Sequence, residues 1–177
     1  MAEDDASTHN QIPNWATPKF ENIPSDLIFQ PWAVWVAEPR TGQPGKFNKA
    51  PRSPKTGFNI ASSKPQTFGT FEEAKRAYQT GKYTGVGVLL TNNGIIGVDI
   101  DNYPEIFKQK PEIKAWVQLA IQHGHYCERS PSKTGLRLFI KGELPGAGRK
   151  HEGLEIYQTA RFLTVTGRIV KTNGGQS

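Results

Sequence analysis

The sequence predicts a single mixed α/β (α+β) domain. Runs of β-branched and aromatic residues alternate with two helix-like segments, and no strict strand–helix–strand repeat links them. A chain of 177 residues suits one domain that buries its own core without disulfide staples. We expect a mobile N-terminal segment over 1–24, the folded domain over 25–170 and a flexible tail over 171–177.

The strands are predicted from short apolar runs. "WAVWVAE" (32–38), "GVGVLLT" (85–91) and "GIIGVDI" (94–100) are strand-like, and the "NNG" between the last two indicates a hairpin turn. "PRTGQPGKFNKAPRSPKTGFN" (39–59) is rich in Gly, Pro and Lys, which favours an extended hairpin or a long ordered loop. Three more short strands are expected at 135–142, 153–158 and 161–167.

Two segments carry the end signals of helices. The segment 70–81 opens with a Thr N-cap and two early glutamates and closes on Gly. The segment 111–124 opens with Pro and Glu, places apolar residues at helical spacing and also ends on Gly. Helices are therefore predicted over both.

Composition limits the functions to consider. The net charge of +6 suits a polyanionic partner such as nucleic acid or a nucleotide, although an ordinary soluble protein can carry the same charge. The one cysteine, Cys127, excludes a disulfide framework and a cysteine-based zinc site within the chain. No apolar run could span a bilayer, and the acidic, polar start does not resemble a signal peptide. We expect a cytoplasmic protein with no membrane partner.

The run "GIIGVDIDN" contains two aspartates where aspartate is unfavourable. Asp99 and Asp101 alternate with Val98 and Ile100, so both acids share one face of the predicted strand. Like charges on one face repel each other. By the same alternation, Arg137 and Glu155 lie opposite the apolar faces of two later strands. If these three strands are neighbours in one sheet, the charged groups converge.

Three carboxylates without a His or Cys partner are hard oxygen ligands, which suit Mg²⁺ or Mn²⁺. Asp99, Asp101 and Glu155 are therefore candidate metal ligands and catalytic residues, and one or two ions held there could clamp a phosphoryl transfer. Arg137 offers planar donors for phosphate. The alternative is a half-exposed sheet with polar residues on its wet face.

Two further segments could bind phosphate. In "SPSKTG" (130–135), Ser130, Ser132 and Lys133 together with backbone N–H groups could cradle a phosphate, although a plain turn would use the same residues. In the basic stretch "GRKHEG", His151 is the histidine best placed to touch one.

The order of these motifs is similar to that of a known family. "WAVWVAEPRTGQPGKFNKAPRSPKTG", "TFEEAKRAYQTGKYTGVGVLLT", "IIGVDIDN", "CERSPSKTGLRLFIKGELPGAGRK" and "GLEIYQTARFLTVTG" resemble the primase–polymerase branch of the archaeo-eukaryotic primase superfamily. The resemblance covers roughly residues 30 to 168. Such domains occur in phages, plasmids and other mobile elements, often N-terminal to a helicase.

The resemblance implies an RRM-like catalytic core plus a second small α/β unit, with the active site between them. The family's metal-binding Asp-x-Asp motif matches Asp99 and Asp101, and its later strand acid matches Glu155. A Ser-rich turn and a strand histidine normally contact the incoming triphosphate. Here the turn is present, but the strand position is Arg137, which can bind phosphate and cannot shuttle a proton.

The activity implied is template-directed nucleotidyl transfer on single-stranded DNA, with nucleoside triphosphates as substrates, two Mg²⁺ or Mn²⁺ ions as cofactors, and a helicase domain or subunit as an expected partner. Arg161 is expected to reach a phosphate or the template. The expected nucleic-acid path is basic: Lys46, Lys49, Arg52, Lys55, Arg149, Lys150 and His151. Two alternatives stay open: a non-catalytic, degenerate module that binds nucleotide or single-stranded DNA, and a metal-dependent nuclease.

Overall fold

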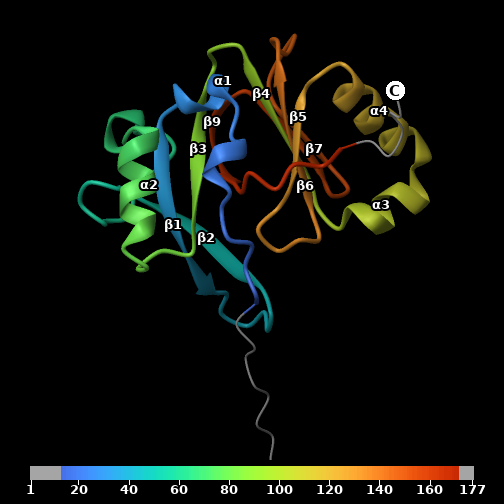
Figure 1. Ribbon diagram of the computed structural model, residues 1–177. Coiled ribbons are helices and arrows are strands. Elements are labelled where there is room, and N and C mark those ends of the chain that lie inside the picture. Colours follow the sequence, from blue (N-terminus) through green and yellow to red (C-terminus); the bar gives the residue numbers. More distant parts are fainter. Residues whose placement is uncertain (1–12, 172–177) are drawn as a thin grey trace, which may run out of the picture.

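The computed structural model describes residues 13–171, and these form the expected α+β fold. Figure 1 shows two sheets side by side, with α2 on one flank and the pair α3 and α4 on the other. The strands are β1 (Trp32–Pro39), β2 (Phe47–Arg52), β3 (Gly85–Thr91), β4 (Ile95–Ile100), β5 (Tyr126–Arg129), β6 (Leu136–Lys141), β7 (Arg149–His151), β8 (Leu154–Tyr157) and β9 (Thr159–Val165). The helices are η1 (Phe20–Asn22), α1 (Ser25–Ile28), η2 (Pro65–Thr67), α2 (Phe71–Gln79), α3 (Tyr103–Gln109) and α4 (Pro111–Gln122).

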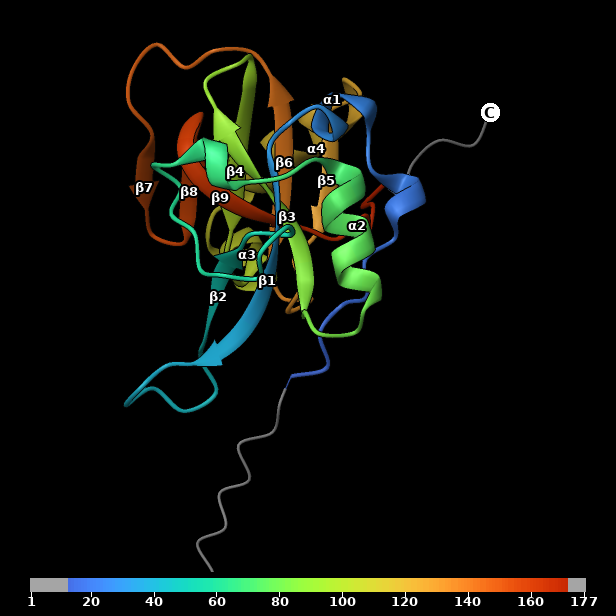
Figure 2. The same cartoon turned by 90° about the vertical axis from the view of Figure 1, so that its left-hand side faces the viewer.

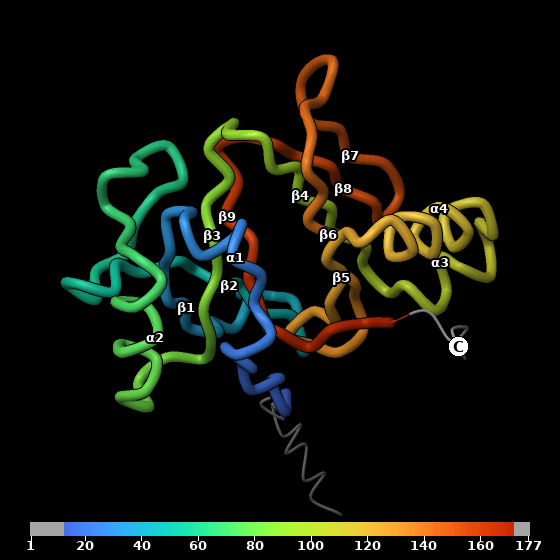
Figure 3. Tube along the Cα trace, turned by 45° about the horizontal axis from the view of Figure 1, so that its top comes forward, coloured from blue at the N-terminus to red at the C-terminus, as the bar shows by residue number. Residues whose placement is uncertain are grey.

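Each sheet is antiparallel throughout, and we name them sheet A and sheet B. Sheet A has the strand order β2-β1-β3-β9, and sheet B the order β5-β6-β4-β8-β7. The three strands that carry Asp99, Arg137 and Glu155 are therefore neighbours, as the sequence argument required, while Asp101 comes directly after the end of β4. Figure 3 shows the two sheets side by side, with the N-terminal segment between them.

The hairpin predicted at "NNG" is wrong. Asn92 and Gly94 do adopt positive φ angles of 59° and 83°, as a tight turn requires, but β3 and β4 belong to different sheets. Both strands are almost wholly buried, and each is flanked by two other strands of its own sheet. The chain returns to sheet A between β8 and β9, next to Ala160, whose φ is 51°.

The two sheets approach each other closely at Gly97 of β4. A Cβ atom there would overlap Leu163 Cδ1 of β9 and would lie 2.8 Å from Leu90 Cδ1 of β3, so only glycine permits this approach. Around it, Ile95 and Phe139 of sheet B join the apolar core of sheet A and α2. This contact fixes the spacing of the sheets next to the charged part of β4.

The predicted helices are confirmed with small shifts in their ends. Thr70 caps α2 in a capping box with Glu73, which explains the start of that helix. Helices α3 and α4 cover the outer face of sheet B, where Val98, Ile100 and Leu138 form a second core cluster with Val117. The elements η1, α1, η2, α3, β5 and β7 were not predicted. None of the helices in the described part of the chain is long and apolar enough to cross a membrane.

The folded part begins earlier than the sequence predicted. Within the expected mobile segment 1–24, Ala16 and Ile23 are buried, and the Lys19 N–H donates to Thr166 O at 2.8 Å. The buried apolar side chains and this backbone hydrogen bond hold the segment against the rest of the fold. Residues 1–12 of that segment, and 172–177 of the predicted tail, lie outside the described residues.

Candidate active site

A row of charged residues crosses the whole of sheet B. Asp99 of β4 lies opposite Arg137 of β6 on one side and Glu155 of β8 on the other. The row continues to Glu128 of β5, opposite Arg137, and to Lys150 of β7, opposite Glu155. Strand alternation produces this row, because the intervening residues turn their apolar side chains toward α3 and α4.

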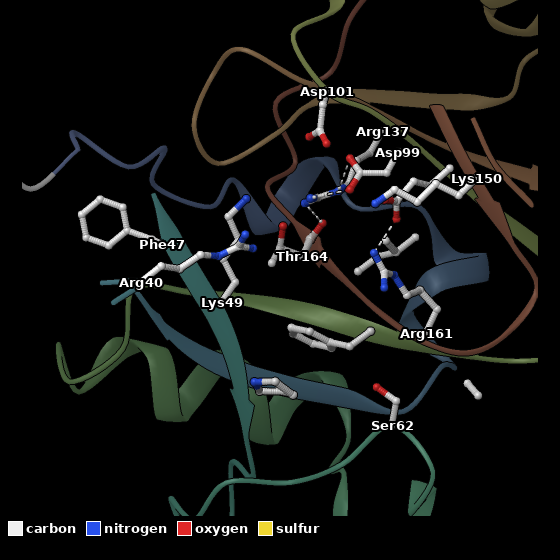
Figure 4. Close-up of a pocket in the computed structure, with 15 residues that line it drawn as sticks. Arg40, Phe47, Lys49, Ser62, Asp99, Asp101, Arg137, Lys150, Arg161 and Thr164 are labelled. Carbon is white, nitrogen blue, oxygen red and sulfur yellow. Dashed lines mark hydrogen bonds and ion pairs between the residues drawn. The ribbon is translucent and has the colours of Figure 1, made fainter. Parts of the chain in front are cut away.

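The row opens into a cleft of about 610 Å³ between the two sheets. Sheet B and sheet A both line it, with five basic side chains and three acidic ones. Figure 4 shows Arg40 and Lys49 on one side, facing Asp99, Asp101 and Arg137 on the other. The lining residues are Arg40, Phe47, Lys49, Pro51, Ser62, Asp99, Asp101, Arg137, Lys150, Glu155, Ala160, Arg161, Phe162, Leu163 and Thr164.

Arg137 is 4% exposed and bridges the sheets. Its Nη1 donates to Thr164 O of β9 at 2.8 Å, and its Nη2 donates to Asp99 Oδ2 at 3.3 Å. The other carboxylate oxygen, Asp99 Oδ1, lies 3.3 Å from Arg137 Nε but accepts no hydrogen bond. Arg137, which the sequence predicted to bind the triphosphate, thus lies in the cleft. Two of its N–H groups already donate to other residues of the protein.

Asp101 follows β4 at the edge of the cleft, where its backbone N–H donates to Gly153 O at 2.9 Å. Partial desolvation raises the pKa of its carboxyl above the usual value, and the nearby Asp99 charge raises it further. A cation between the two carboxylates would relieve both penalties.

Glu155 is 5% exposed, and both of its oxygens are occupied. Arg161 Nη2 donates to Oε2 at 2.5 Å, and the Lys150 ammonium pairs with Oε1. Arg161 also lies over the Tyr157 ring, with 4.7 Å between the guanidinium carbon and the ring centroid. Glu155 therefore shares the cleft with the two aspartates while its carboxylate is bound to two cations.

The metal site expected from the sequence stays a prediction. Within residues 13–171, no three His, Cys, Asp or Glu side chains form a group that could hold an ion. Several cleft atoms are nevertheless buried without a hydrogen-bond partner: Asp99 Oδ1, Arg137 Nε, Arg161 Nε and Thr164 Oγ1. Unpaired buried polar atoms call for a polar partner. Asp99 and Asp101 fit a hard divalent ion, and Glu155 could join only after releasing its two cations.

The basic residues predicted along 46–55 do not all face the cleft, and strand alternation places Lys49 and Arg52 on opposite faces of β2. Lys49 faces the cleft, and burial together with the Arg137 charge lowers its pKa to about 8. Arg52 points to the opposite face and pairs with Glu38 at 2.9 Å, while Lys55 lies 3.7 Å from Glu73. Lys46 is exposed next to the turn of the β1–β2 hairpin, which projects from the body in Figure 2.

The predicted phosphate loop does not line the cleft. Ser130 Oγ and Ser132 Oγ lie 3.0 Å apart, and Ser132 Oγ lies 3.0 Å from Thr134 Oγ1, so the hydroxyls bond to one another. Ser130 Oγ also accepts from Gly135 N at 3.0 Å. Lys133 lines a separate cavity beside Trp15. The hydroxyl groups of this loop therefore form their hydrogen bonds within the turn itself.

Of the remaining predicted basic residues, some line the cleft and others do not. Lys150 and Arg161 line the cleft through their contact with Glu155. Arg149 and His151 are exposed on β7, Arg149 beside a different cavity and His151 3.6 Å from Glu152.

Three residues of functional interest were not among the predicted site residues. Arg40 and Thr164 line the cleft, from the segment after β1 and from β9. Glu128 is fully buried, accepts from Thr166 N and Gly167 N at 2.8–2.9 Å, and accepts from Tyr126 Oη at 2.7 Å. Burial raises its pKa. The signal for Glu128 was an acid next to Cys127 in "YCER", which is too short a run to identify as a strand.

Comparison with known proteins agrees with the motifs. The chain is 28% identical over 148 residues to the DNA primase-polymerase of Nitratiruptor phage NrS-1, and the match covers 78% of this chain. No family model matches the chain. The chain spans only 19% of the length of that relative. The match confirms the resemblance to phage-type primase–polymerase domains that the ordered motifs indicated.

Proposed function

We propose that this chain is a primase–polymerase domain that carries out metal-dependent, template-directed nucleotidyl transfer on single-stranded DNA during replication of a mobile element. The observation that carries the proposal is the cleft between the sheets, where Asp99 and Asp101 face Arg40 and Lys49. Carboxylates for a divalent ion and cations for a polyphosphate are the two requirements of this chemistry.

The chain's own residues have separate parts in this proposal. Arg40 and Lys49 would bind the phosphates of a nucleoside triphosphate from the sheet A side, while Asp99 and Asp101 would hold Mg²⁺ or Mn²⁺ from sheet B. Arg137 orients the Asp99 carboxylate by its ion pair and ties it to β9 through Thr164 O. The ion would supply Lewis acidity to the attacking hydroxyl and the leaving phosphate.

Glu155 is the third carboxylate of this site in the proposal. Its release would free Arg161 and Lys150 at the same time, and both side chains line the cleft. The two cations could then move to phosphate oxygens, which are stronger competitors in a desolvated cleft than a single carboxylate.

One observation favours the non-catalytic alternative, a module that binds nucleotide or single-stranded DNA. Asp99 and Glu155 are both neutralised by side chains of the protein, and the cleft has more basic groups than acidic ones. A cleft of this kind attracts a polyanion without needing a metal.

Primer extension separates the two functions. A labelled primer on a single-stranded DNA template is incubated with nucleoside triphosphates and Mg²⁺ or Mn²⁺, using the parent and the variant Asp99→Asn/Asp101→Asn. We expect the variant to lose about 100-fold or more in incorporation rate. The matched control, Glu112→Gln/Glu143→Gln, removes two exposed acids outside the cleft and should match the parent. Equal activity of parent and aspartate variant would refute the metal-site assignment. A parent that binds DNA without incorporating nucleotide would support the binding module.

A further inference from the structure

A second, smaller cavity of about 240 Å³ is lined by Trp15, whose ring also contacts Phe47 and Lys49 of the main cleft. It has three basic lining residues, Arg129, Lys133 and Arg168, and none of its lining residues is acidic. Its remaining lining residues are Asn14, Trp15, Ala16 and Thr17. It shares none of its lining with the main cleft.

Backbone hydrogen bonds bring the three basic residues to one cavity, while the Arg129 guanidinium carbon lies 5.8 Å from the centroid of the Tyr103 ring. The Arg129 N–H donates to Arg168 O at 2.9 Å, so the two arginines lie on paired segments. Lys133 is fixed in the left-handed region at φ 68°, where its N–H donates to Ser130 O. Like charges gathered in this way repel each other, and no acidic partner within 4 Å of any of the three is found among the described residues. An anion would remove that penalty.

The N-terminal segment closes the cavity and is itself anchored. Ala16 N donates to Pro131 O at 2.9 Å, and Arg168 Nε donates to Thr17 O at 3.0 Å. These bonds leave the Nη groups of Arg168 for a ligand. The cavity is therefore built from three separate parts of the chain: residues 14–17, residues 129–133 and Arg168.

Trp15 connects this cavity to the main cleft. Its ring packs edge-on against Trp35 and Phe47, at centroid distances of 5.5 and 5.6 Å, and Lys49 Nζ lies 5.7 Å from its centroid. Phe47 and Lys49 line the main cleft, so Trp15 belongs to the wall between the two spaces. Trp15 is half-buried, Lys49 lies near its ring, and three basic residues share the cavity that it lines. Aromatic rings beside basic residues can bind single-stranded nucleic acid by base stacking and phosphate pairing.

We propose that Trp15, Arg129, Lys133 and Arg168 form a second phosphate site, which binds a backbone phosphate of the single strand that leaves the main cleft. The proposal rests on the proposed function for the identity of that strand. A nucleoside triphosphate is a poorer fit, because it brings a Mg²⁺ ion that needs carboxylate ligands and this cavity has none. Lys133 accordingly acts on nucleic acid and not on the incoming nucleotide.

The test is the salt dependence of DNA binding without nucleotides or divalent ions. Binding of a labelled oligo-dT is followed by fluorescence anisotropy for the parent, Arg129→Gln and Arg129→Gln/Lys133→Asn, since asparagine tolerates positive φ. The matched control, Arg76→Gln/Lys82→Gln, removes one exposed Arg and one exposed Lys from α2 and the turn after it. All of these substitutions fall on exposed residues, and thermal unfolding checks that each variant is folded.

We expect the double variant to bind about 10-fold more weakly at about 0.1 M salt. Its slope of log K against log salt should become shallower by about 0.7 for each phosphate that the variant no longer neutralises. The single variant should lie between, and the control should stay within about twofold of the parent. A double variant that matches the control overturns the proposal, and so does a parent that binds no oligo-dT.

Two further experiments complete the test. The first distinguishes a DNA phosphate from free phosphate as the ligand, and the second distinguishes failure of this proposal from failure of the proposed function. Inorganic phosphate at about 10 mM should compete only weakly; if it displaces the oligonucleotide from the parent and not from the double variant, the site binds free phosphate and the proposal is overturned. Primer extension by the parent protein, measured beside the binding curves, tests the proposed function separately. A parent that extends nothing refutes the proposed function while the salt slopes still decide this site.

Discussion

Arg137 and Asp99 lie directly opposite each other on β6 and β4, and the guanidinium holds the carboxylate while also donating to Thr164 O across the gap between the sheets. Both side chains are largely buried, at 5% and 14% exposed. The pair therefore has a structural role, joining sheet B to sheet A, in addition to any part it takes in binding phosphate.

Removing the Arg137 cation alone should lower the unfolding free energy more than removing both charges of the Arg137–Asp99 pair. Arg137→Met leaves Asp99 charged and buried and leaves Thr164 O without its donor, and we expect a loss of about 3–5 kcal/mol in unfolding free energy. In Asp99→Asn/Arg137→Met the uncompensated charge is gone, so the double variant should be more stable than Arg137→Met alone. The coupling free energy between the two side chains follows from urea unfolding of the parent, both single variants and the double variant. Additive losses would mean that the pair contributes no mutual stabilisation.

The row of charges shows how far sequence alone reaches. Alternation within three strands placed Asp99, Arg137 and Glu155 on one face, and the strand order made them neighbours. The same reasoning could not find the salt bridges of Glu155, because Arg161 and Lys150 come from β9 and β7, and β7 has only three residues. Alternation fixes the face of a side chain but not its partners.

The fold shows the same limit at "NNG". The turn itself is predictable, because positive φ is a local requirement of Asn92 and Gly94. Whether the strands on either side pair with each other depends on competing partners distant in sequence. Here β1 and β9 flank β3, and β6 and β8 flank β4, so the hairpin is replaced by a crossing between sheets.

The close approach at Gly97 gives a prediction about how the sheets are held. Gly97→Ala would place a methyl group well inside van der Waals distance of Leu163 Cδ1, and the overpacking should cost about 1–3 kcal/mol in unfolding free energy. Leu163→Ala, which removes the clashing atom, should cost less in the Gly97→Ala background than in the parent, where it leaves a cavity in the core. Thermal or urea unfolding measures both effects.

The matched control is Gly146→Ala, where no atom lies within 4 Å of the added methyl and φ is not positive. That variant should unfold like the parent or at a slightly higher temperature. If Gly97→Ala is as stable as Gly146→Ala, the sheets are not in close contact at this point.

Lys49 should make ligand binding depend on pH. Burial and Arg137 lower its pKa to about 8, so the ammonium loses its proton as pH rises from about 7 to about 9. Because anion binding requires the charged form, affinity for oligo-dT or a nucleoside triphosphate should fall across that interval. Lys49→Arg, which stays charged, should bind equally at both pH values. Anisotropy or calorimetry at fixed ionic strength gives the comparison, and an equal fall in both proteins would exclude Lys49 as the cause.

Ligand affinity should fall as pH rises, whereas the contribution of Lys49 to the stability of the fold should rise. Its folded pKa of about 8 lies below the ordinary lysine pKa of 10.5, so between these values the unfolded state binds more protons than the folded state. The Lys49 contribution to the unfolding free energy therefore rises with pH over that window and is constant below it. Subtracting the pH profile of Lys49→Met from that of the parent isolates it, and a difference that falls as pH rises above about 8 would contradict the assignment.

The two ion pairs of Glu155 predict weak metal binding by the free protein. Arg161 and Lys150 neutralise the carboxylate that a third ligand position would need. In Lys150→Gln/Arg161→Gln the carboxylate keeps its place opposite Asp99 but loses both cations, so Mn²⁺ should bind about 10-fold more tightly. Titration of Mn²⁺ by electron paramagnetic resonance, without DNA or nucleotide, measures this directly.

Two variants decide whether the gain passes through Glu155. Glu155→Gln added to the double variant should return Mn²⁺ affinity to the parent level, because the freed carboxylate is gone. Asp99→Asn added instead should reduce affinity below the parent, because it removes a ligand that the parent already offers. If tighter binding survives Glu155→Gln, the gain comes only from the lower positive charge of the cleft, and Glu155 is then a structural partner of Arg161 and Lys150 and not a metal ligand.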